Sequence, residues 1–156
     1  MSLMEEITSK EEIQKDVIDW SNYICDMYDK LIKDRIRKTS IKNELKDYSE
    51  LYDALVITES NYIEIMKILK EMAQKKELNE LILSLDLLSK LSKKSLDVLN
   101  IKLWFEYREN NASDENGEYL IIDDVRDQLA DRFFEVGRFA NRIKQSIIKI
   151  NDKSES

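Results

Sequence analysis

Two pairs of acidic residues have the spacing expected of an oxygen-ligand metal site. Asp26 and Asp29 are three residues apart, and so are Glu50 and Asp53. Helical residues three apart share a face, so each pair would present two neighbouring carboxylates. If antiparallel helices brought the pairs together, they could bind Mg²⁺, which prefers oxygen ligands, and the metal could orient water for attack on a phosphate. In a chain with 32 acidic residues, the same pairs could instead be solvated helix faces.

The order of these pairs resembles that in the MazG-type all-helical nucleotide pyrophosphohydrolases. The pattern in that family is Glu-x-x-Glu, followed after a helix-turn-helix interval by Glu-x-x-Asp. Glu50–Asp53 (ELYD) matches the second pair, whereas Asp26–Asp29 (DMYD) has aspartates in place of both glutamates. The resemblance covers residues 20–56. It implies a Mg²⁺-dependent enzyme acting on nucleoside triphosphates, with these four carboxylates as metal ligands.

The composition excludes several other chemistries. The chain has no histidine, which removes the usual nucleophile–histidine pairs and the Glu-x-x-His ligands of di-iron bundles. One cysteine cannot form a thiolate zinc site, and two glycines twenty residues apart cannot form a phosphate loop. A net charge of −7 does not favour nucleic acid as a partner, although an accessory protein with a local arginine patch is a third possibility.

The same composition predicts one all-α domain. With no proline and two glycines among 156 residues, the chain suits long helices better than short strands and turns. We expect a leader or disordered segment over residues 1–8, a helical domain over residues 9–151 and a frayed polar tail over residues 152–156. The single cysteine, the charged N-terminus and the lack of a long uncharged window predict a cytoplasmic protein without a membrane span.

Apolar repeats at steps of three and four predict four long helices in an antiparallel up-down bundle. We expect a first helix over residues 9–37, capped by Thr8 or Ser9. The second should run from Ser40 to Met72, with a kink or a split near residue 58, where β-branched and capping residues gather. A third is expected to end near Tyr107, and a fourth to begin at Asp123 or Asp124. The predicted elements between and after these points are a polar turn at 74–76, a loop at 108–118, an extended segment or hydrophobic plug at 119–122, and the end of the last helix near residue 151.

The stretch from Leu78 to Leu103 is the most apolar part of the chain. Its leucines spread around most of a helical circumference, which predicts a central helix covered on several sides. Leu85 should therefore be buried. On the last helix, Gly137 and Ala140 would allow another helix to approach closely.

Candidate partner-binding residues lie near the end of the third helix and on the fourth. Trp104 and Phe105 could form an apolar knob, or could be covered by the segment 119–122. Arg138 and Arg142 could bind an anion or an acidic partner, or could form surface ion pairs. The acids at 123, 127 and 131 could hold a cation, or could complement the helix dipole.

These patterns favour a non-catalytic helical-bundle protein that acts through contact with a protein partner or with itself, and that needs no cofactor. The alternative is the Mg²⁺-dependent pyrophosphohydrolase, with a nucleotide as substrate.

Overall fold

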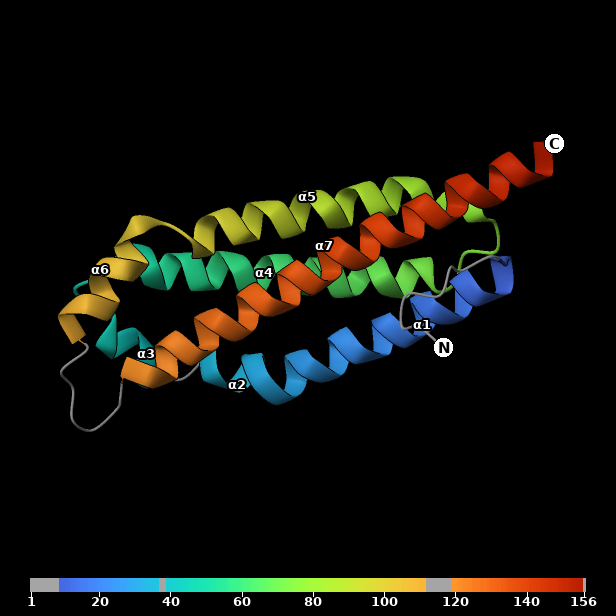
Figure 1. Cartoon of the computed structure of the whole chain (residues 1–156). Helices are drawn as coiled ribbons and strands as arrows, with labels where there is room; N and C mark the ends of the chain where they lie inside the picture. Colours follow the sequence, from blue (N-terminus) through green and yellow to red (C-terminus); the bar gives the residue numbers. More distant parts are fainter. Residues whose placement is uncertain (1–8, 37–38, 112–118, 156) are drawn as a thin grey trace, which may run out of the picture.

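The computed structural model describes residues 9–36, 39–111 and 119–155, and within these ranges it is helical without strands. Four long helices run alternately up and down (Figure 1), which confirms the predicted all-α bundle. The elements are α1 (Lys10–Met27), η1 (Tyr28–Ile32), α2 (Lys33–Ile36), α3 (Thr39–Glu44), α4 (Ser49–Met72), η2 (Leu78–Glu80), α5 (Leu81–Leu99), α6 (Lys102–Asn111) and α7 (Tyr119–Glu155). The predicted leader at 1–8 lies outside the described residues. No described helix is both long and apolar enough to span a bilayer.

The first predicted helix is confirmed as α1, η1 and α2 in succession. Its N-cap is Ser9, whose hydroxyl oxygen accepts the backbone N–H of Glu12 at 3.2 Å. The π-helical turn η1 interrupts the α-helical ladder, and it contains two buried residues, Tyr28 and Ile32. Within the bundle, the Tyr28 hydroxyl donates to a carboxylate oxygen of Glu59 at 2.8 Å.

The second helix was predicted either as one helix with a kink near residue 58 or as two shorter helices, and the structure rules out the two shorter helices. Helix α4 runs without interruption from Ser49 to Met72, and the buried Thr58 hydroxyl donates to the Leu55 carbonyl of its own helix. The break falls earlier, between α3 and α4, where Tyr48 leaves the helical conformation. Burial of Thr58 within the bundle outweighs its weak intrinsic helix preference.

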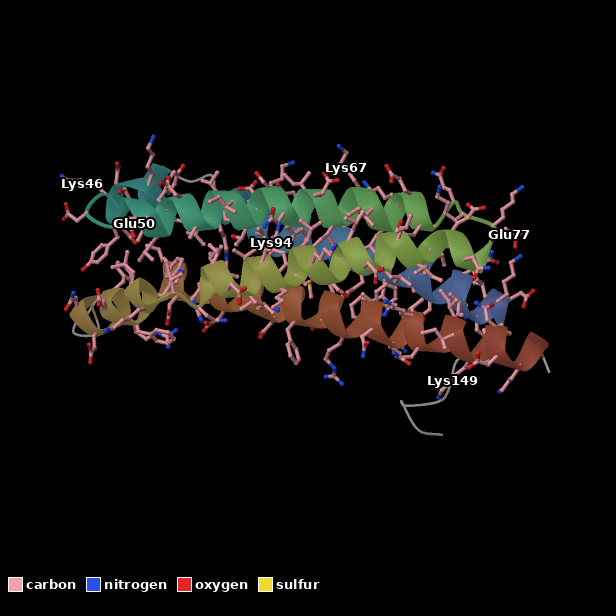
Figure 2. The ribbon with its side chains drawn as sticks, turned by 90° about the horizontal axis from the view of Figure 1, so that it is seen from above. Lys46, Glu50, Lys67, Glu77, Lys94 and Lys149 are labelled. Carbon is pink, nitrogen blue, oxygen red and sulfur yellow. The ribbon has the colours of Figure 1, made fainter. Side chains whose placement is uncertain are left out.

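Helix α5 is not the enclosed centre of the bundle. It packs against α4 and α7, as Figure 2 shows, and its remaining side faces solvent. Leu85 is buried as expected, but Leu83 is 78% exposed and Leu87 is also exposed. Two neighbouring helices cover only part of a helix circumference. The leucines on the covered side of α5 therefore join the core, and those on the other side remain in contact with solvent.

The predicted third helix is split, because α5 ends at Leu99 and α6 begins at Lys102. The segment 119–122 was expected to be an extended segment or a hydrophobic plug, and it forms the first turn of α7. Asp123 and Asp124 therefore lie inside that helix instead of capping it. Part of the loop predicted at 108–118 is the end of α6, and its remainder lies outside the described residues. Helix α7 also continues through residues 152–155, where a frayed tail was expected.

Candidate functional site

The four acidic residues of the predicted magnesium site do not converge. Asp29, Glu50 and Asp53 are exposed, and exposed Asp26 pairs with Lys30 of its own helix turn at 3.0 Å. Among the described residues, no group of three or more potential ligands is placed to hold a metal ion. The inward faces of these helices carry apolar side chains such as Leu51, so the acid pairs point outward. The geometry therefore adds no support to the pyrophosphohydrolase alternative.

The acids near the start of α7 bind arginines. Asp123 accepts from Arg108 of α6 at 3.0 Å, and Asp124 accepts from Arg35 of α2. Asp127 pairs with its neighbour Arg126 at 2.7 Å. The pairs of Asp123 and Asp124 join α6 and α2 to α7, so these acids contribute to packing, whereas Asp131 of the predicted cation site is exposed.

Trp104 and Phe105 do not form a joint apolar knob. Trp104 is 3% exposed, and its indole N–H donates to the Val98 carbonyl at 3.3 Å. Phe105 points outward, with the Arg126 guanidinium 5.9 Å from its ring centroid. The tryptophan therefore belongs to the core, and only the phenylalanine is available to a partner.

A groove of about 570 Å³ lies between α1 and α7. Its floor is aromatic, since the rings of Trp20 and Phe139 are 4.9 Å apart. Arg142 spans the groove and donates to Asp16 at 2.6 Å. Partial burial raises the pKa of the Asp16 carboxyl, and the positive charge of Arg142 opposes this change. Arg142 therefore joins two helices, and its charge is already paired within the chain.

A second groove, of about 450 Å³, lies between α5 and α7. A Cβ added to Gly137 would lie 3.7 Å from the Cβ of Ser92, which is an ordinary van der Waals distance. The contact between α5 and α7 at this point therefore does not require glycine, in contrast to the role expected of Gly137. The Ser92 side chain is buried, and its hydroxyl has no hydrogen-bond partner among the described residues. Leu96 and Phe133 supply apolar lining.

The outer face of α7 between the two grooves carries an exposed aromatic ring. Phe134 is 56% exposed, and the guanidinium of Arg138 lies 5.7 Å from its centroid. Arg138 lines both grooves. Its side chain has no carboxylate partner among the described residues, in contrast to Arg126, Arg132 and Arg142 of the same helix. We name Asp131, Phe134 and Arg138 the α7 ridge.

Comparison with known proteins adds no relative. No family model matches the chain, and no curated protein and no solved structure matches it significantly. The candidate site therefore depends on geometry alone.

Two features were not predicted from the sequence, the burial of Arg126 and the groove beside Ser92. Arg126 is buried and donates to the Leu99 carbonyl at 2.8 Å, at the point where α5 ends. Its position beside Val125, in the apolar repeat of α7, was the available signal. The groove beside Ser92 was also missed, although a serine within a leucine-rich helix marks a place where little side-chain volume fills the surface.

Proposed function

We propose that this chain is a non-catalytic interaction or assembly protein, and that it binds a protein partner through the α7 ridge. The observation that carries this proposal is the exposed Phe134 ring beneath the Arg138 guanidinium, which has no carboxylate partner in the described part of the chain. Aromatic residues and arginine dominate the energetic centres of protein interfaces. Their position between two grooves would let a partner pack on both sides of the ring.

The charge of the chain supports a protein partner over nucleic acid. Its net charge is −7, and three of the four arginines of α7 between residues 126 and 142 are occupied by internal carboxylates. A phosphate backbone would require several free cations on one face. A cytoplasmic location, favoured by the single cysteine, is part of the same proposal.

A photo-crosslinking amino acid at position 134 tests this function in the cells that make the protein. The matched control carries the same group at position 83, which is exposed on α5, outside the ridge. We expect discrete protein adducts from position 134 that disappear with Arg138→Glu and that are absent from position 83. Equal adducts from both positions, or none from position 134, would contradict the proposal.

A further inference from the structure

We propose that the partner of the α7 ridge is a second copy of this chain, packed antiparallel so that α7 lies on α7. This inference rests on the proposed function and names the occupant of the same surface. It follows from the order of charges on the ridge, the neutrality of its surroundings and the shape of the neighbouring groove.

The acid and the arginine on the ridge would face opposite charges if two copies packed antiparallel. Asp131 and Arg138 are both exposed, and neither has an ion pair among the described residues. They are seven residues apart, which places them on one face at a separation of about 10 Å. A two-fold axis midway between them, beside Phe134, would put each Asp131 opposite the partner's Arg138. Parallel packing would instead place like charges together.

The ridge is also the part of an acidic chain where two copies can meet. A net charge of −7 makes two copies repel, so a contact between them needs a locally neutral surface. Beside the ridge, Glu135 is paired with Arg132 at 3.1 Å, and Arg142 is paired with Asp16. Asp131 and Arg138 remain for contact on the ridge itself, and the groove beside it adds one exposed charge of each sign, Lys93 and Asp97. A strongly acidic or strongly basic partner would meet as much repulsion there as attraction.

The groove between α5 and α7 provides room for the apolar part of this contact. It borders Phe134, and Gly137 presents no side chain to an approaching surface. In the antiparallel arrangement, the partner's Phe134 would lie over this groove, against Leu96 and Phe133. Each copy would then bury one aromatic ring that is otherwise in water, which is a favourable change repeated twice by the symmetry.

Sedimentation equilibrium of the full chain from about 1 to 100 µM tests the inference. We expect the apparent mass to rise from the 18.5 kDa of one chain toward twice that value. Arg138→Asp and Asp131→Arg should each weaken dimerisation at least about tenfold, because each sets like charges opposite one another. The double variant, with the two charges exchanged, should recover the dimer to within about threefold of the original.

Lys67→Asp is the matched control, since it makes the same change in net charge at an exposed position on α4, on the side away from α7 (Figure 2). It should leave dimerisation unchanged. A chain that stays monomeric, an Arg138→Asp variant that equals Lys67→Asp, or a double variant as weak as the single ones would each overturn the inference. If the chain is monomeric but still gives specific adducts from position 134 to another protein, the second copy is wrong as the partner and the proposed function stands. If there is neither dimerisation nor a specific adduct, the proposed function is wrong as well.

Discussion

Replacing Arg126 by methionine tests how the end of α5 is held. The side chain is buried and joins three groups: the Leu99 carbonyl at 2.8 Å, the Asn100 side-chain oxygen at 2.7 Å and the carboxylate of Asp127 at 2.7 Å. It thereby satisfies one of the carbonyls that a helix leaves open at its C-terminus. Methionine keeps much of the apolar stem and removes every donor.

The expected loss follows from these bonds. Hydrogen bonds from a charged donor each contribute about 1.5–3 kcal/mol, and the Leu99 carbonyl would be left buried without a partner. The contact with Asp127 contributes little, because that carboxylate is 53% exposed. We therefore expect the free energy of unfolding to fall by about 2–4 kcal/mol, which lowers the melting temperature by roughly 5–15 °C for a chain of this size.

Urea denaturation of Arg126→Met against Arg142→Met provides the measurement. Arg142 is an exposed arginine on the same helix, so its loss should cost about 1 kcal/mol or less. Hydrogen exchange should also speed up at the last amides of α5 in Arg126→Met alone. If the two variants are equally stable, or if the α5 amides exchange at their original rates, then Arg126 does not hold the end of that helix.

Three further predictions concern the core, the pH dependence and the alternative function. Leu85→Asp should unfold the chain by burying an unpaired charge, whereas Leu83→Asp should be tolerated; circular dichroism separates these outcomes. Burial holds the pKa of the Tyr62 hydroxyl above its usual 10.0. The protonated hydroxyl therefore makes its full contribution to folding stability below about pH 10, where Tyr62 is neutral in the unfolded chain too. Stability should therefore decline above about pH 10, and Tyr62→Phe should reduce that slope in urea titrations. Mg²⁺ with nucleoside triphosphates should leave the melting temperature unchanged, and a rise abolished by Asp53→Asn would instead support a pyrophosphohydrolase.

Local sequence signals located much of the helical framework. The Ser9 cap and the apolar repeat after it place the first helix correctly, because capping and periodicity depend on residues within a few positions of each other. The same signals left a split near residue 58 open, where residues with weak helix preference remain helical. Burial against neighbouring helices is a larger contribution than helix propensity, and a local pattern does not contain it.

The candidate site was only partly predictable for a related reason. Arg138 was named from the sequence, but its exposed position over Phe134 depends on the packing of α7. Trp104 was named beside Phe105, and the fold buries it. Whether a side chain meets solvent depends on which helix covers it, which adjacent residues do not specify.

By itself, the sequence determined the all-α class, the main helical repeats and the chemistry that the absence of histidine removes. These properties follow from residue types and from spacings within a few helical turns. The tertiary structure alone decided that α5 is open to solvent on one side, that the acid pairs stay apart, and that Arg126 is buried while Arg138 is exposed. Each of these depends on contacts between residues far apart in the chain, and a helical periodicity specifies a face without specifying what will cover it.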